Sequence, residues 1–465
     1  MSLFRTRGLR RRGALVSVAA LLALWSTGPL AAQTTPLHLP FTIDTLPNGL
    51  TLIVHQDRSV PTVAVNMWYH VGSGDERVGR TGFAHLFEHL MFMGSQNAEY
   101  PVFDRLLEAA GANNNGSTTE DRTNYYESGP RTALPLMLWL EADRMGWLLP
   151  TMDSAKVDLQ RDVVKNERRQ SYENRPYGMA FTELPGAMYP AGHPYSWPVI
   201  GSMRDLTAAS VEDVKNFFRM YYAPNNATLV VVGDCTPAHL KALEGQYFAG
   251  VPRQPDPPPV TCDYKISPGA RHRDVTDPHA NLPAALRFYR IPPHADRDTP
   301  ALDLLNVILG QGESSRLNVA VVRNAKAAVA VQAFANPFGP RRGPGVLVIF
   351  GIVNQGVAVE HLDSLIGMQI DSIRSSGVTP EELTKAKNTF RAGFIQDRET
   401  TLSKAEDLHH YDMFHDSLAE INTDLDRYLS VTADDIRRVA NKYLDPANAL
   451  TVIVRPAATP SGGAQ

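Results

Sequence analysis

The sequence has little cysteine, no excess of basic charge and few long apolar runs. Only two cysteines, Cys235 and Cys262, occur among 465 residues, too few for a disulfide scaffold, a four-cysteine zinc site or an iron–sulfur cluster. Whether the two pair with each other stays open. Lysine and arginine number 45 against 49 acidic residues, so nothing favours nucleic acid as a partner. Any bound metal must therefore be held by histidines and carboxylates.

The apolar run near the N-terminus is short. Arginines at positions 5, 7 and 10–12 precede the apolar stretch 14–25, which cannot span a bilayer. Small residues just before Gln33 are typical of a cleavage site, so residues 1–32 are predicted to be a signal peptide, with a signal anchor as the alternative. The adjacent arginines leave both Sec and twin-arginine export open. We expect an exported protein, periplasmic or secreted, with no membrane span in the mature chain.

Two segments repeat each other at an offset of 222 residues, the first at 211–232 and the second at 433–454. Each passes from a helical pattern through a proline turn into a β-branched strand. The identical positions in the first copy are Tyr221, Pro224, Asn226 and Ala227. We therefore predict a duplicated chain. The predicted parts are a first domain at 33–251, a proline-rich linker at 252–269, a homologous second domain at 270–458 and a flexible tail at 459–465.

Within the first half, strand-like runs precede helical patterns. Residues 50–55 and 62–70 are rich in β-formers, whereas 103–110, 134–145 and 156–170 have apolar residues at helical spacing. Strict βαβ alternation is missing. The sequence therefore predicts an α+β fold with two homologous halves, each a mostly antiparallel sheet covered by helices on one face.

The chemistry is concentrated in the segment His85-Leu-Phe-Glu88-His89. On a helix, His85 and His89 at i and i+4 present two imidazoles on one face, the spacing that a tetrahedral zinc ion accepts. Glu88 lies beside them, where a general base could reach water. Because the neighbouring residues are apolar, a helix with two core histidines is the alternative interpretation.

A zinc hydrolase needs a third protein ligand. The segment 161–170 offers the carboxylate of Glu167 on a second helical pattern. On spacing alone, Glu173 or Glu183 could be the third ligand instead.

These residues resemble the pitrilysin and insulin-degrading (M16) family of metallopeptidases and its processing-peptidase relatives, whose signature is the inverted zinc motif His-x-x-Glu-His. The likeness extends over nearly the whole predicted mature chain and fits a two-domain, processing-peptidase-like bacterial member. Family-like blocks occur in family order at 46–50, 82–85, 163–167, 192–195, 199–201 and 222–226.

The resemblance implies roles for the motif residues. His85, His89 and Glu167 would be zinc ligands and Glu88 the general base of a zinc endopeptidase acting on unfolded peptides. The second-half window 300–310 has neither histidine nor glutamate, so we expect one zinc ion per chain. The alternative function is a non-catalytic peptide-binding or assembly subunit of a peptidase-like heterodimer.

Substrate contacts are also implied. Asn115 begins a segment that looks like the family's edge strand beside the zinc, where an extended peptide pairs through its main chain. In the family, the half without zinc contributes an Arg and, seven residues later, a Tyr that hold the substrate carbonyl. Arg323 matches the Arg, but Ala330 occupies the Tyr position. We therefore predict a heterodimer with a related chain that supplies both, with a homodimer as runner-up.

One further polar cluster stands out in the second half. Asp407, His409, His410 and His415 lie close together in sequence but match no known ligand spacing. We expect them on a helix surface.

Overall fold

The computed structural model describes residues 38–262, 270–337, 339 and 342–457. The predicted signal peptide at 1–32 and tail at 459–465 lie outside the described residues, as does the end of the predicted linker. The domain boundaries drawn from the sequence stay a prediction.

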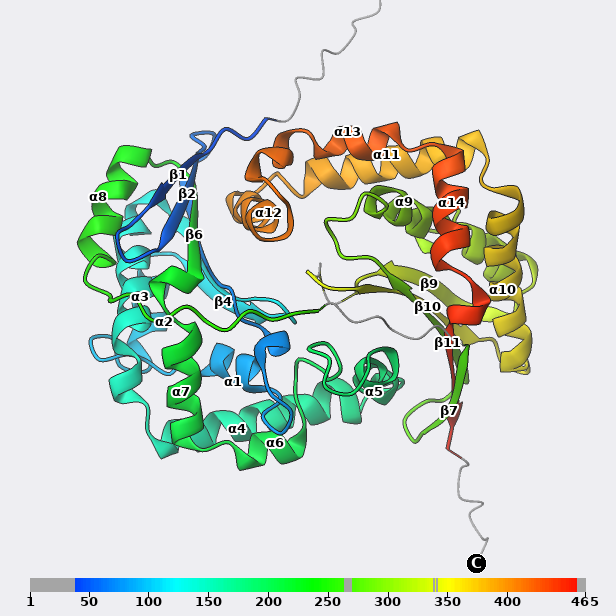
Figure 1. Ribbon diagram of the computed structural model, residues 1–465, viewed down its shortest axis with the longest axis horizontal. Coiled ribbons are helices and arrows are strands. Elements are labelled where there is room, and N and C mark those ends of the chain that lie inside the picture. The colour runs from blue at the N-terminus through cyan, green and yellow to red at the C-terminus, as the bar shows by residue number, and fades with distance from the viewer. Residues whose placement is uncertain (1–37, 263–269, 338, 340–341, 458–465) are drawn as a thin grey trace, which may run out of the picture. The chain divides into compact units, whose positions relative to one another are not determined.

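The first half contains a six-stranded sheet with strand order β1-β2-β6-β3-β5-β4 (Figure 1). Its strands are β1 (Thr42–Thr45), β2 (Thr51–Gln56), β3 (Thr62–Tyr69), β4 (Asn113–Thr118), β5 (Thr123–Pro130) and β6 (Ala227–Gly233). Only β2 and β6 pair in parallel; the other neighbours are antiparallel. Strand β4 is an edge, paired with β5 alone.

The second sheet repeats this order. It runs β7-β11-β8-β10-β9, which matches β2-β6-β3-β5-β4, and its one parallel pair, β7 with β11, corresponds to β2 with β6. Its strands are β7 (Arg271–Asp277), β8 (Ala284–Ile291), β9 (Ala328–Ala335), β10 (Gly345–Val353) and β11 (Leu450–Pro456). The prediction of an α+β fold in two halves with mostly antiparallel sheets is confirmed.

Helices connect many of the strands in both halves. Those of the first half are α1 (Phe83–Leu90), α2 (Val102–Ala109), α3 (Leu134–Trp147), α4 (Ser154–Arg168), α5 (Gly178–Met188), α6 (Met203–Ala208), α7 (Val211–Tyr221) and α8 (Pro237–Tyr247). Those of the second half are α9 (Thr299–Gly310), α10 (Val359–Ser376), α11 (Pro380–Gln396), α12 (Thr401–Phe414), α13 (Asp424–Ser430) and α14 (Ala433–Tyr443). The helices predicted in the first half correspond to α2, α3 and α4. A π-helical turn, Arg169–Glu173, continues α4.

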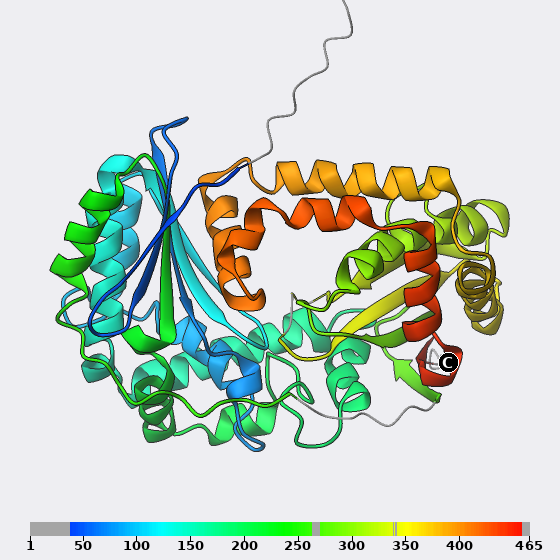
Figure 2. The same ribbon diagram turned by 45° about the horizontal axis from the view of Figure 1, so that its top comes forward.

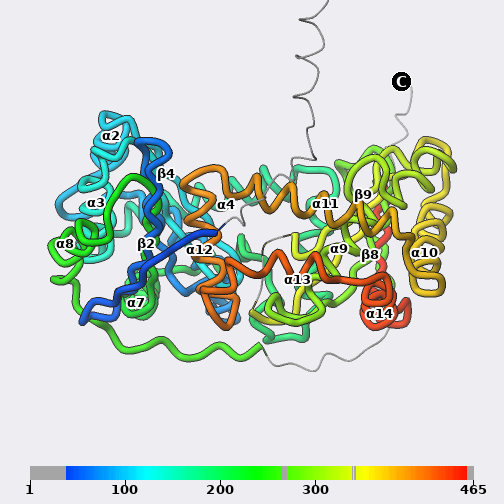
Figure 3. Tube along the Cα trace, turned by 90° about the horizontal axis from the view of Figure 1, so that it is seen from above, coloured from blue at the N-terminus to red at the C-terminus, as the bar shows by residue number. Residues whose placement is uncertain are grey.

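Each sheet packs its own half's helices against one face, as the alternation of strand residues requires. In β2, Leu52 and Val54 join the core under α1 and α3. The residue between them, Ile53, points to the other face and packs against α12 of the second half. Figures 2 and 3 show α12 beside the first sheet, on the side away from α3 and α8.

The second sheet is covered in the same way by a helix from the first half. On the second sheet, Leu286 and Val348 pack against Leu184 and Met188 of α5, a helix from the first half. Each half therefore covers the remaining face of the other half's sheet with one helix. This arrangement makes α12 a neighbour of the strands that surround the candidate site.

Two further features are the state of the cysteines and the character of the longest helices. Cys235 and Cys262 are both free thiols. In the described part of the chain, no helix combines the length and apolar character needed to cross a membrane.

Candidate metal centre and active site

Helix α1, which carries the His-x-x-Glu-His motif, has a buried carboxylate at its start. Glu76 accepts hydrogen bonds from the backbone N–H groups of Gly82 (2.9 Å) and Ala84 (2.8 Å). The first N–H groups of a helix have no partner within the helix, and they favour negative charge. Glu76 therefore fixes where α1 begins, and with it the direction of the side chains that follow.

The entry into α1 also needs two glycines. Gly82 has a φ of +89°, a left-handed conformation that favours glycine. A Cβ placed on Gly201 would lie 2.4 Å from the Cα of Gly82, so the two backbones can cross only without side chains. This contact explains why two blocks far apart in sequence both contain glycine.

His85, His89 and Glu167 come together between α1 and α4. Glu167 Oε2 lies 3.6 Å from His85 Nε2 and 3.3 Å from His89 Nε2, and one donor atom from each residue falls within 4.8 Å of the others. Ligand atoms about 2.0–2.1 Å from a tetrahedral zinc ion are separated by about 3.3 Å. The spacing therefore fits zinc.

The protonation states fit a metal as well. Burial lowers the pKa of His85 to about 4, so its ring is neutral at pH 7 and keeps a free lone pair. The hydrogen bond with His89 lowers the pKa of Glu167, which is therefore a carboxylate. Two imidazoles and one carboxylate form a donor set that zinc accepts.

Of the three glutamates that spacing left open, the structure brings Glu167 to the histidines. Glu173 instead accepts a hydrogen bond from Arg168 at 3.0 Å, and Glu183 is exposed on α5. Glu167 also remains partly open to solvent, with 40 % of its side chain exposed. The cluster therefore lies at an accessible surface.

Glu88 lies on the side of α1 that faces β4. Its Oε2 accepts a hydrogen bond from the Thr118 hydroxyl at 2.6 Å. Burial raises the pKa of Glu88, although the Thr118 hydrogen bond acts in the opposite direction. The sequence showed no signal for Thr118 as the residue that orients Glu88.

The edge strand β4 passes directly over Glu88. A Cβ built on Gly116 would lie 3.2 Å from Cγ of Glu88 and 3.1 Å from the backbone oxygen of Asn124, so the strand approaches this closely only because residue 116 is glycine. Asn115 is exposed, and its Oδ1 accepts a hydrogen bond from the N–H of Gly116 at 2.8 Å.

A polar network behind β4 was not foreseen from the sequence. Arg122 donates to the backbone oxygen of Ser117 at 2.8 Å and lies over the Trp68 ring. Glu406 of α12 accepts hydrogen bonds from Asn66 (2.8 Å) and Asn124 (2.9 Å). These contacts tie the second half to the strands beside Glu88.

Arg323 is not part of this cluster. It is exposed and pairs with Glu313 at 2.6 Å. Ala330 lies exposed on β9, the edge strand that corresponds to β4. Among the described residues, Arg323 makes no hydrogen bond or ion pair with the histidines or glutamates of the cluster.

The prediction that His409 and its neighbours lie on a helix surface is wrong. His409 is only 1 % exposed. Its ring stacks on Trp68 with centroids 4.7 Å apart, and its Nε2 lies 2.9 Å from the backbone oxygen of Asn66. The side chain of His415 is 3 % exposed. Helix α12 is buried because it packs on the sheet of the other half, a contact that its own sequence does not reveal.

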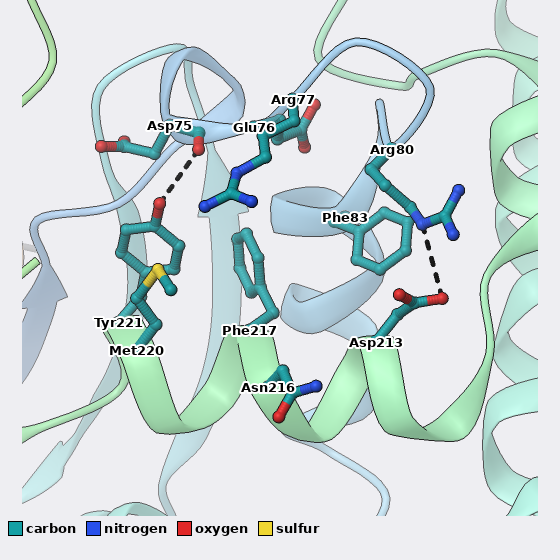
Figure 4. Close-up of a pocket in the computed structure, with 10 residues that line it drawn as sticks. All are labelled: Asp75, Glu76, Arg77, Arg80, Phe83, Asp213, Asn216, Phe217, Met220 and Tyr221. Carbon is teal, nitrogen blue, oxygen red and sulfur yellow. Dashed lines mark hydrogen bonds and ion pairs between the residues drawn. The ribbon is translucent and has the colours of Figure 1, made fainter. Parts of the chain in front are cut away.

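A pocket of about 230 Å³ lies on the far side of α1, between the loop that precedes this helix and α7 (Figure 4). Phe83 of α1 lines it together with Phe217, and the Tyr221 hydroxyl donates to the backbone oxygen of Asp75 at 3.0 Å. Arg80 and Asp213 face each other at 3.4 Å across one side. None of the candidate metal ligands lines this pocket.

The chain is similar to known proteins over most of its length. Residues 51–196 match the family described as "Insulinase (Peptidase family M16)", and residues 208–390 match "Peptidase M16 inactive domain". A relative named "Zinc protease PqqE" from Helicobacter pylori is 31% identical over 421 residues, which cover 89% of this chain and 92% of the relative. The chain belongs to peptidase family M16.

Solved structures place it in the same fold. A crystal structure of a protease from Helicobacter pylori aligns with a TM-score of 0.84 and 28% identity over 90% of this chain and 100% of that one. Pitrilysin aligns with a TM-score of 0.72 and 18% identity over 90% of this chain and 45% of its own length. At that identity, pitrilysin bears on the fold alone. The sequence-based assignment to the M16 family is confirmed.

Proposed function

We propose that this M16 chain is a zinc-dependent endopeptidase that hydrolyses unfolded peptides. His85, His89 and Glu167 would hold one zinc ion at this centre, and Glu88 would act as general base. The observation that carries the proposal is the meeting of these three donors, at separations that suit zinc, with Glu88 and an edge strand beside them.

The roles of the chain's own groups follow from their contacts. When bound, zinc supplies Lewis-acid chemistry: it acidifies water and polarises a carbonyl group. Thr118 holds Oε2 of Glu88, which leaves Oε1 to take a proton from the attacking water and later give it to the leaving amine. The partly buried setting of Glu88 limits competing solvent around that proton.

The substrate would bind along β4. This strand pairs with β5 on one side only, so its other side can accept an extended peptide through main-chain hydrogen bonds. Such pairing reads the backbone rather than side chains, which favours unfolded segments over any one sequence. Asn115, exposed on this strand, would contact the bound peptide.

A partner chain would complete the site. Arg323 is already paired with Glu313, and Ala330 has no hydroxyl to donate. We infer that a related M16 chain supplies an Arg and a Tyr near the substrate carbonyl, with a homodimer as runner-up. Peptide hydrolysis by the chain alone and with that partner tests this point; full activity of the lone chain would contradict it.

Location and domain organisation belong to the same proposal. Residues 1–32 would direct export to the periplasm or beyond, and the catalytic and metal-free domains would occupy 33–251 and 270–458. Mass spectrometry of the exported protein would give the first residue of the mature chain. An N-terminus well away from Gln33 would contradict the proposed cleavage.

The competing function is a peptide-binding or assembly subunit without turnover. The family that matches residues 208–390 is described as an "inactive domain", which favours this alternative for the second half. Against it stands the complete set of His85, Glu88, His89 and Glu167 in the first half.

One pair of variants separates the two functions. Glu88→Gln should keep the zinc ion of this centre and lose cleavage of an unstructured peptide, whereas His85→Ala should lose the zinc ion of this centre as well as cleavage. Cleavage retained in Glu88→Gln would refute the role of Glu88. A wild-type chain that folds without metal and cleaves nothing, alone or with its partner, would favour the binding subunit.

A further inference from the structure

A second group of metal-ligating side chains lies in the second half. His294 belongs to the segment between β8 and α9, and His410 and His415 lie at the C-terminal end of α12. One ring nitrogen from each of the three histidines falls within 4.8 Å of the others. The sequence did not predict this group, because His294 is separated from the other two by more than a hundred residues.

A carboxylate orients the ring of His415, as is common for metal-binding histidines. Its Nδ1 lies 3.1 Å from Oε2 of Glu420, a contact that places the proton on Nδ1 and leaves the lone pair on Nε2. That Nε2 is buried and has no hydrogen-bond partner, and the side chain is only 3 % exposed. A carboxylate behind the ligating ring is the common outer contact of histidine–zinc sites. A buried acceptor without a partner is otherwise costly.

The other two rings are also available. Among the described residues, neither His294 nor His410 uses a ring nitrogen in a hydrogen bond; their rings meet edge to face, with centroids 4.6 Å apart. Burial lowers the pKa of His294 to about 4 and that of His410 well below its ordinary value. Both rings are therefore neutral at pH 7, the form that binds a metal.

The surroundings leave room for an ion. His294 and His410 line a cavity of about 160 Å³, large enough for a water molecule as a further ligand. Two arginines lie near the cluster, but each is paired with a carboxylate: Arg398 with Asp407 at 2.6 Å and Arg427 with Asp424 at 2.8 Å. Their charge is therefore largely balanced.

We propose that His294, His410 and His415 bind a divalent first-row transition metal ion of the zinc class. Three imidazole nitrogens with an open fourth position suit such an ion and do not suit calcium or magnesium, which prefer oxygen ligands. The site is separate from the His85–His89–Glu167 centre and does not depend on its function. It departs from the sequence-based expectation of a single zinc per chain.

The ion would fasten α12 in place. Its ligands join the end of this helix to the segment that follows β8, while Glu406 on the same helix bonds Asn66 and Asn124 in the first half. The three ring nitrogens lie within 4.8 Å of one another, so a single ion bound to all of them would hold the end of α12 against this segment. We therefore expect the metal to raise the melting temperature.

The test uses the full chain with the first centre removed. In the variant His85→Ala/His89→Ala, we expect one bound zinc ion per chain after loading and dialysis, and a higher melting temperature with zinc than with a chelator. Adding His410→Ala should abolish both effects. Cobalt(II) offered instead of zinc should give the visible absorption of a tetrahedral imidazole site only in the variant that keeps His410.

Folding is checked by circular dichroism. If His410→Ala does not fold, His294→Ala in the same background should abolish zinc binding in its place, because His294 lies in an irregular segment outside the buried helix. A His85→Ala/His89→Ala protein that binds no zinc would overturn the proposal and leave the three rings as aromatic packing. Zinc that persists after His410 or His294 is removed would overturn it equally.

Discussion

The two histidine clusters of this chain differ in how they are built. His85 and His89 lie one turn apart on α1, and a carboxylate from α4 completes the group. In the second cluster, one histidine comes from the segment after β8 and two from the end of α12, with no carboxylate among the ligands. The first has a short sequence signature, whereas the second exists only because two distant segments meet.

Their surroundings differ as well. The first cluster lies beside an edge strand and a glutamate held by Thr118, so substrate and base are both close by. The second lies against a small cavity, and none of the residues that line this cavity belongs to a strand. On our two proposals, the first cluster serves chemistry and the second holds α12 to the segment that follows β8. Four predictions test this difference.

The largest expected effect is the contrast between His89→Ala and His410→Ala. Loss of His89 removes a ligand of the proposed reactive centre, so peptide hydrolysis should fall by at least about a thousandfold. Loss of His410 should change the rate by about twofold or less. It should lower the melting temperature of the zinc-loaded protein, because both the packing of a buried ring and a metal ligand are lost. Equal losses of activity in the two variants would break the proposed division of roles.

The next effect concerns the carboxylate behind the second cluster. Glu420→Ala removes the acceptor for Nδ1 of His415 and should weaken zinc binding at that cluster by about 10–100-fold. Asp416→Ala is the control, since Asp416 is exposed nearby on the same segment. Calorimetric titration in the His85→Ala/His89→Ala background measures both. Similar affinities for the two variants would count against the orienting role of Glu420.

A smaller effect is expected at the edge strand. In Gly116→Ala, the new methyl group meets Glu88 and the backbone of Asn124, so β4 must shift and the base with it. We expect kcat to fall about tenfold while zinc content stays unchanged. Gly245→Ala, at a position with open space around it, should leave kcat as it was. A wild-type rate in Gly116→Ala would show that the close approach has no catalytic role.

The smallest effect is a pH dependence of α12 docking. Lys404 of α12 forms an ion pair with Asp57 at the end of β2. Burial alone would raise the pKa of Asp57, but hydrogen bonds from Lys404 and Ser59 outweigh it and hold the pKa well below its ordinary value. The stabilisation is therefore complete above the ordinary Asp pKa of about 4 and is lost as the pH falls below it.

Melting temperatures of wild type and Asp57→Asn, compared between neutral and acid pH, measure this contribution. The variant should be less stable by about 1 kcal/mol at pH 7, and the difference should shrink in acid. Asp426→Asn, an exposed aspartate of α13, should show no such convergence. A constant difference at all pH values would contradict the assignment.

Much of the first half could be predicted from the sequence because its signals are local. Strands β2 and β3 follow from runs rich in β-forming residues, and helices α2, α3 and α4 from apolar residues at a spacing of about 3.6. His85, Glu88 and His89 share one helix. Glu167 could be proposed from a helical pattern, but choosing it over Glu173 and Glu183 needed either the family likeness or the geometry. Spacing along one helix says nothing about which second helix lies opposite.

The sequence by itself determined the repeat, which appears as identical residues at one constant offset. It also determined the α+β class and the pair of imidazoles on α1, since both depend on residues a few positions apart. Only the tertiary structure decided that Glu76 caps α1, that Thr118 orients Glu88, that α12 is buried and that His294 joins His410 and His415. The Glu76 contact spans only six to eight residues but depends on how the loop before α1 folds back. The other contacts join segments farther apart in the chain and form only when surfaces of those segments bury each other. No local sequence pattern specifies which surface a given helix will pack against.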